Sequence, residues 1–183
     1  PVACQQKNLC QSVTSVGEHK NPLRGIYLHI NYQMNNYMNL SIFQNMTSKL
    51  PQPGSLEGVA NLIRSDEKLA AFTRSYRQTG SKSFKSEAQL FSVACLFEGG
   101  KGRGNVRQLT RLSLVDFDYI MPHTDSTDAA KILAKMKAKI IADPHTLMSY
   151  ITMSGNGLRV IFTYDIAPEF TGIPKDADEV KKF

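Results

Sequence analysis

Two aspartates separated by one residue have the clearest chemical potential in this sequence. Asp116 and Asp118 lie in the apolar run 112–119. Alternate side chains of a β-strand share a face, so we expect both carboxylates on one side, with Phe117 and Tyr119 turned into a core. Neighbouring ionised carboxylates repel each other, and a hard cation such as Mg²⁺ or Mn²⁺ relieves the repulsion. The pattern predicts a metal site at a strand end, unless both acids simply point to solvent.

A glycine hairpin forms a second group of polar residues downstream. Ser154, Gly155 and Gly157 lie between two β-rich stretches, and Arg159 follows directly. The Asn-Gly pair in this loop is a strong hairpin signal. Backbone N–H groups at glycines, a serine hydroxyl and a guanidinium are suitable donors to phosphate oxygens. The pattern therefore predicts a nucleotide-phosphate site, and an ordinary turn with an exposed arginine is the alternative.

A glycine-rich basic loop at 99–104 precedes the aspartates. Lys101 and Arg103 lie within it and Arg107 follows it. The loop lacks the Gly-Lys-Ser/Thr ending of a P-loop, so we exclude a Walker A site. It is interpreted either as a nucleic-acid contact or as a solvated hairpin turn.

Hydrophobic periodicity predicts the elements that position these residues. Strands are expected at 24–32, 40–43, 112–119, 147–153 and 158–164. Helices are expected at 56–64, from a cap at Ser65 to Thr79-Gly80, and at 126–142, with an ambiguous helix-to-strand change within 82–97. Pro and Gly at 51–54 are expected to break regular structure.

These elements predict an α+β fold with an antiparallel or mixed sheet and helices packed on one face. The expected organisation is an N-terminal arm or partial strand region at 1–40, a domain at 41–165, and at 166–183 a C-terminal tail or the start of a truncated remainder. In the helix at 126–142, Ile132, Leu133, Met136 and Ile140 are predicted to form a buried stripe. Lysines at 131, 135 and 139 form a basic ridge beside it.

Composition limits the function classes. The 183 residues are 42% hydrophobic and 21% charged, which is typical of a globular protein. The net charge of +6 modestly favours a polyanionic partner. No apolar run approaches the length of a membrane span and no secretory signal is found, so we expect a cytoplasmic protein without a membrane partner.

The order of the three motifs resembles that of a known family. Phe-Glu-Gly-Gly-Lys-Gly-Arg at 97–103, Leu-Val-Asp-Phe-Asp at 114–118 and Met-Ser-Gly-Asn-Gly-Leu-Arg at 153–159 follow one another. This arrangement resembles the archaeo-eukaryotic primase superfamily and, within it, the VirE N-terminal domain of mobile elements of Bacteroidetes. The resemblance covers roughly residues 41–165.

The resemblance implies a primase-like, RRM-like core and specific roles for the site residues. Asp116 and Asp118 would be the catalytic metal ligands. The motif around the hairpin would bind the incoming nucleoside triphosphate through Ser154, Gly155, Gly157 and Arg159. The implied reaction is metal-dependent nucleotidyl transfer on a single-stranded DNA template, with a helicase domain in the same full-length protein as a further expected partner.

Two departures from the family pattern leave alternatives open. Arg159 stands where catalytic members have histidine, and a permanently charged guanidinium cannot relay a proton. A third acid is also missing, since Asp165 follows the last strand too closely. The alternative is a non-catalytic DNA- or nucleotide-binding module of a replication or mobilisation protein. A sugar-nucleotide transferase also uses Asp-x-Asp, but a long Rossmann-like half is lacking here.

Overall fold

A computed structural model describes residues 28–30, 39–118 and 126–165 of the chain. The helices are α1 (Leu56–Ser65), α2 (Glu67–Thr79), α3 (Ser83–Glu87) and α4 (Ser126–Ala142), with a 3-10 turn at Arg103–Asn105. The strands are β1 (Leu28–Ile30), β2 (Leu40–Phe43), β3 (Gln52–Gly54), β4 (Leu90–Ser92), β5 (Cys95–Phe97), β6 (Val106–Leu109), β7 (Leu112–Phe117), β8 (Thr146–Ile151) and β9 (Leu158–Thr163). The predicted α+β class is confirmed.

The largest sheet has the strand order β1-β8-β9-β7, and each neighbouring pair is antiparallel. The expected strands at 112–119, 147–153 and 158–164 correspond to β7, β8 and β9, each ending slightly earlier. Of the strand predicted at 24–32, the described part is β1, which pairs with β8. The sheet therefore combines a segment near residue 30 with the three strands that carry the motifs.

One face of this sheet packs against α1. Leu112 of β7, Met148 and Tyr150 of β8 and Ile161 of β9 are buried in a cluster with Val59 of α1. Leu28 and Ile30, predicted to share a strand face, both pack against this cluster. Because side chains alternate along a strand, Asp116 and Arg159 lie on this same α1-facing side, beyond the apolar residues.

Two smaller sheets complete the architecture. One has the order β3-β2-β4 and the other pairs β5 with β6. The segment 51–54 was expected to break regular structure, but Pro53 lies opposite Ser41 in the antiparallel β2–β3 pair. That prediction is wrong because β3 is an edge strand, where proline lacks only an N–H that the sheet does not need.

The helix boundaries differ from expectation in two places. Asp66, rather than Ser65, caps α2, since its side chain accepts a hydrogen bond of 2.6 Å from the Leu69 N–H. The Ser65 hydroxyl instead donates to the Asn61 carbonyl of α1. Between 82 and 97, where a single helix-to-strand change was expected, the chain forms α3 and then two short strands. Gly80 ends α2 as predicted, and it does so in the left-handed conformation.

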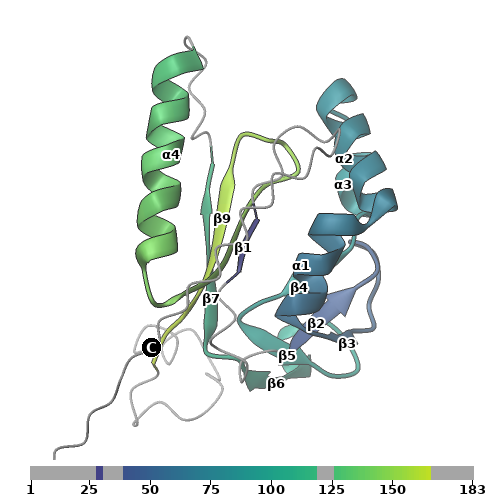
Figure 1. Cartoon of the computed structure of the whole chain (residues 1–183). Helices are drawn as coiled ribbons and strands as arrows, with labels where there is room; N and C mark the ends of the chain where they lie inside the picture. The colour runs from purple at the N-terminus through teal and green to yellow at the C-terminus, as the bar shows by residue number, and fades with distance from the viewer. Residues whose placement is uncertain (1–27, 31–38, 119–125, 166–183) are drawn as a thin grey trace, which may run out of the picture.

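Helix α4 has the predicted boundaries, but its exposed side differs. Ile132, expected in the buried stripe, is 49% exposed. Lys137 is half-buried instead, and this burial lowers the pKa of its ammonium group. Figure 1 shows α4 on one side of the main sheet and α1, α2 and α3 on the other, so helices cover both sides instead of the single face expected. No described helix is long and apolar enough to cross a membrane.

Candidate functional site

The glycine hairpin between β8 and β9 packs directly on the end of β7. A Cβ atom at Gly157 would lie 3.1 Å from the Phe117 carbonyl oxygen and 2.9 Å from the Thr152 hydroxyl oxygen. A side chain there would press against the backbone of β7, so glycine is favoured at this position. The hairpin and the aspartate strand therefore meet at one end of the main sheet, which we call the sheet end (residues 116–118 and 152–159).

A row of three polar side chains crosses the sheet end. Asp116, Arg159 and Tyr150 lie opposite one another on β7, β9 and β8. The Arg159 Nε and Nη2 atoms donate to the same oxygen, Oδ2 of Asp116, at 2.9 and 2.7 Å. The Arg159 side chain is 41% exposed and that of Asp116 is 31% exposed. The arginine is thus oriented by its neighbours while part of it still faces solvent.

The surroundings of Arg159 also shift pKa values in this row. Burial opposes the charge of Arg159, but hydrogen bonds to Asp116 and Tyr150 outweigh it and raise the pKa of the guanidinium. Burial raises the pKa of the Tyr150 phenol, and the charge of Arg159 only partly offsets that effect. The row therefore holds a permanent cation, stabilised by a carboxylate and a neutral phenol.

The backbone of the hairpin uses its N–H groups internally. The Gly155 N–H donates to the Thr152 carbonyl at 2.9 Å, and the Gly157 N–H donates to the Thr152 hydroxyl at 3.2 Å. The Ser154 hydroxyl lies 2.9 Å from the same Thr152 hydroxyl. Both glycine N–H groups are therefore occupied in this conformation, because the turn closes on Thr152. The phosphate site expected at the hairpin stays a prediction.

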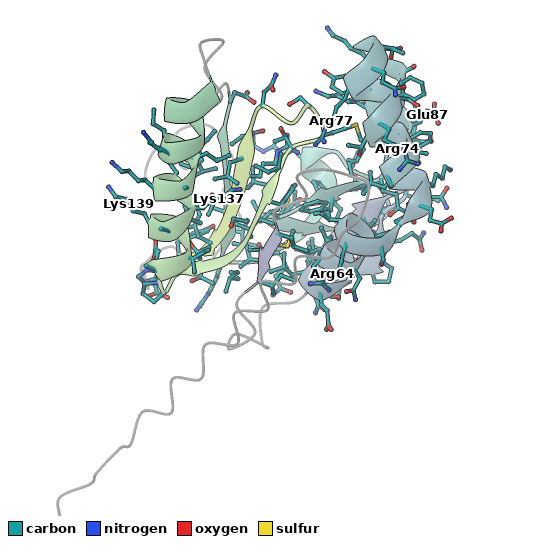
Figure 2. All side chains as sticks on the ribbon, turned by 45° about the horizontal axis from the view of Figure 1, so that its top comes forward. Arg64, Arg74, Arg77, Glu87, Lys137 and Lys139 are labelled. Atoms are coloured by element: carbon teal, nitrogen blue, oxygen red, sulfur yellow. The ribbon has the colours of Figure 1, made fainter. Side chains whose placement is uncertain are left out.

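A second arginine reaches the hairpin from α2. The Arg77 Nε atom donates to the Met153 carbonyl at 3.0 Å, and its guanidinium lies against Gly155 (Figure 2). Arg77 was not among the residues predicted for the site, although residues 68–86 include five basic and no acidic side chains. Tyr150 was not predicted either, and its place beside Arg159 depends on the β8–β9 register.

The two aspartates predicted to hold a metal ion have different surroundings. Asp118 is exposed and makes no side-chain hydrogen bond or ion pair with the described residues, whereas Asp116 gives one oxygen to Arg159. Within the described part of the chain, no three acidic, histidine or cysteine side chains cluster. A guanidinium and a divalent cation on one carboxylate repel each other, so these residues as arranged do not complete a site. The Mg²⁺ or Mn²⁺ site stays a prediction.

The apolar neighbours of the aspartates are less buried than expected. Phe117, predicted to turn into a core, is 38% exposed, and Val115 on the same side is 37% exposed. The buried face of β7 is instead the one that carries Asp116, since α1 covers its beginning at Leu112. Tyr119, expected beside Phe117, lies outside the described residues. The alternation was predicted correctly, but the buried face was not.

Comparison with known families provides a classification. A sequence model of the BT4734-like N-terminal domain matches residues 83–183, more than half of the chain. The chain belongs to the BT4734-like N-terminal domain family. The matched residues include the sheet end and the glycine-rich loop but not α1 or α2, so Arg77 lies outside them.

This BT4734-like assignment replaces the family expected from the motifs. Membership of the VirE N-terminal domain family is wrong, because the matching model describes a different family. The motifs misled because Asp-x-Asp and glycine turns are short patterns that recur in unrelated proteins. No curated protein and no solved structure matches the chain.

The glycine-rich loop of this BT4734-like domain lies away from the sheet end. It joins β5 to β6, and β6 leads into the start of β7, whereas the sheet end lies at the other end of that strand (Figure 1). Lys101 Nζ donates to the Met46 carbonyl, and Arg107 forms an ion pair with Glu98. Arg103 belongs to the 3-10 turn. The structure therefore does not bring these three basic residues together with the hairpin.

The glycines of that loop have a structural explanation. Gly99 has a left-handed φ of 72°, and a Cβ atom at Gly100 would lie 2.8 Å from the Asn105 side-chain oxygen. The Asn105 amide donates to the Glu98 carbonyl at 3.0 Å and closes the hairpin. These contacts favour the interpretation of the loop as a hairpin turn.

A cavity of about 330 Å³ lies between α1, α2 and the strands β2 and β4. Its lining is mainly apolar, with Leu62, Phe72 and Phe91 among the larger side chains, and Asp66 and Lys68 supply charged groups. It shares no residue with the sheet end.

Proposed function

We propose that this domain binds single-stranded DNA through backbone phosphates at the sheet end, as a non-catalytic module of a cytoplasmic replication or mobilisation protein. The observation that carries the proposal is the half-exposed Arg159, held between Asp116 and Tyr150 beside the hairpin. A guanidinium fixed in this way loses little side-chain freedom when it binds a phosphate. The net charge of +6 is consistent with a polyanionic partner.

Binding at Arg159 requires a phosphate to compete with Asp116. The carboxylate occupies two N–H groups, on Nε and Nη2, and Tyr150 accepts a further hydrogen bond, so the rest of the guanidinium is left for a ligand. The Ser154 hydroxyl near the start of the hairpin is a further donor, since either it or its Thr152 partner can donate in their shared hydrogen bond. A phosphate at this position would therefore meet side-chain donors from β9 and from the loop.

The test is binding of a labelled oligothymidylate, followed by fluorescence anisotropy at several salt concentrations. Each phosphate contact on a single strand contributes about 0.7 to the slope of log K against log salt. A double variant, Arg159→Gln with Asp116→Asn, removes both charges of the pair and leaves the net charge unchanged. It should lower the affinity and reduce the slope by about 0.7.

Lys139→Gln is the control for loss of a positive charge elsewhere on the molecule. Lys139 is exposed on α4, on the other side of the sheet, so its removal should leave the slope unchanged (Figure 2). Equal slopes for the wild type and the double variant would refute the proposed site. Wild-type affinity that does not fall with salt would refute phosphate binding altogether.

Metal-dependent nucleotidyl transfer from nucleoside triphosphates is a second candidate. One observation favours it: Asp118 and the Asp116 Oδ1 atom have no side-chain partner among the described residues and belong to the same strand end. The assay is nucleotide incorporation on a single-stranded template with Mg²⁺ or Mn²⁺. Incorporation by the wild type but not by the variant with Asp116→Ala and Asp118→Ala would support catalysis, and equal incorporation would remove it.

A further inference from the structure

We propose that Arg77 of α2 is a second DNA-binding residue, which contacts a backbone phosphate next to the one bound at Arg159. This inference rests on the proposed function and extends it to a helix outside the matched family region. The single strand would run from the sheet end across the hairpin and onto α2.

The contacts of Arg77 leave most of its guanidinium available. Its Nε atom donates to the Met153 carbonyl, and no carboxylate pairs with it among the described residues. The side chain is exposed, and its Nη atoms carry four further N–H groups. Arg159, by contrast, already shares its charge with Asp116. Arg77 is therefore the less neutralised of the two arginines at the hairpin.

The backbone N–H groups at 155–157 are already engaged within the hairpin. The N–H groups of Gly155 and Gly157 are bonded to Thr152, and that of Asn156 lies 3.4 Å from the Ser154 hydroxyl. An anion approaching the loop from the α2 side would therefore meet the Arg77 guanidinium first. The position at Gly155 keeps this approach open, because a Cβ atom there would lie 3.4 Å from the Arg77 Cζ atom.

Arg77 and Arg159 lie on the same side of the main sheet. Arg159 belongs to the face that α1 covers, since it lies in register with Tyr150, a member of the cluster with α1. Helix α2 lies on that side as well (Figure 1). The two guanidinium groups therefore flank the same hairpin from the sheet and from the helix, which suits consecutive phosphates of one strand.

Further positive charges lie on α2 and in the segment that follows it. Between Glu67 and Glu87 the sequence contains no acidic residue, and its basic residues are Lys68, Arg74, Arg77, Lys82 and Lys85. Arg74 lies one turn before Arg77, so the two side chains share a side of α2 (Figure 2). A polyanion that reaches Arg77 therefore meets further positive charge rather than repulsion.

The experiment compares the salt dependence of oligothymidylate binding for three variants of the full chain. Arg77→Gln should reduce the slope of log K against log salt by about 0.7. The ratio of wild-type to variant affinity should therefore fall about 2.5-fold between about 50 and about 200 mM salt. Arg77→Lys keeps a positive charge near the hairpin and should retain most of the slope.

Arg64→Gln is the matched control on the same side of the molecule. Arg64 is exposed on α1 and lies well away from the hairpin, so this variant removes the same charge without touching the site (Figure 2). Its slope should equal that of the wild type. If Arg77→Gln and Arg64→Gln change the slope equally, the effect is one of net charge and the inference is overturned.

Thermal unfolding distinguishes binding from a purely structural role. If Arg77 acts only through its contact with Met153, Arg77→Gln should have a lower melting temperature and a lower affinity but an unchanged salt slope. This result would overturn the inference. A reduced slope that Arg77→Lys restores supports it. If the Arg159 double variant changes the slope and Arg77→Gln does not, only this inference fails. If the wild type does not bind the oligonucleotide, the proposed function fails with it.

Discussion

Substitution of Asp116 in the Asp116–Arg159 pair has different expected results for the two candidate functions. If Arg159 binds phosphate, Asp116 competes with the ligand, and Asp116→Asn should strengthen DNA binding. If Asp116 instead holds a catalytic cation, the same change should abolish nucleotidyl transfer. We expect the first result, because two of the hydrogen bonds that Arg159 donates fall on one carboxylate oxygen of Asp116.

The partial exposure of the pair sets the size of the effect. Exposed pairs typically contribute about 0.2–1 kcal/mol, whereas breaking a buried pair costs about 3–5 kcal/mol. With side chains 41% and 31% exposed, we expect Asp116→Asn to lower the free energy of unfolding by about 1–2 kcal/mol. Relief of the competition should be worth about 1 kcal/mol, which corresponds to about fivefold tighter binding.

Asp118→Asn is the control, since it removes the same charge from the same strand end without an arginine contact. It should tighten binding by about twofold or less, through screened electrostatics alone. Anisotropy titrations of both variants at one salt concentration provide the comparison. Equal gains for the two variants, or weaker binding by Asp116→Asn, would refute competition at Arg159.

Three further predictions concern stability and are measured by urea denaturation. Gly155→Ala should lower the free energy of unfolding by about 1–2 kcal/mol, because φ is 82° at this position. Gly104→Ala should leave it nearly unchanged, because nothing lies within 4 Å of the added Cβ atom. Equal losses of stability in the two variants would contradict the strain argument. Asp66→Ala should lower the free energy of unfolding by about 1 kcal/mol, because α2 loses its cap. A larger loss of stability in Ser65→Ala would show that the cap is misassigned. The raised pKa of Tyr150 keeps the phenol neutral in the folded protein, so the free energy of unfolding should fall as the pH rises above the ordinary tyrosine pKa of 10.0. This fall with pH should be less steep in Tyr150→Phe. The same pH dependence in the wild type and the variant would disprove this linkage.

Much of the fold followed from periodicity and turn chemistry. The α4 boundaries and the strands around the hairpin were predictable, because each combines a regular apolar pattern with clear end signals. Where two cap-forming residues adjoin, as at Ser65 and Asp66, local sequence does not decide which hydroxyl or carboxylate turns towards the helix. The Pro-Gly segment at 51–54 was also ambiguous, since an edge strand tolerates proline and a central strand does not.

The site was predicted only as far as local patterns reach. The meeting of Asp116 with Arg159 depends on the β7–β9 register, which tertiary packing determines. Arg77 reaches the hairpin from 76 residues away in the sequence, and no spacing rule predicts such a contact. Which face of β7 is buried depends likewise on the position of α1, so alternation alone left two choices for Phe117.

The closure of the hairpin on Thr152 has a consequence for binding kinetics. A loop whose turn is already fixed by its own hydrogen bonds has little conformational entropy left to lose when a ligand arrives. Association should then proceed without a slow ordering step, at a rate governed by electrostatic attraction. Thr152→Val would remove the hydroxyl bond while keeping a similar shape, and the loosened loop should bind more slowly.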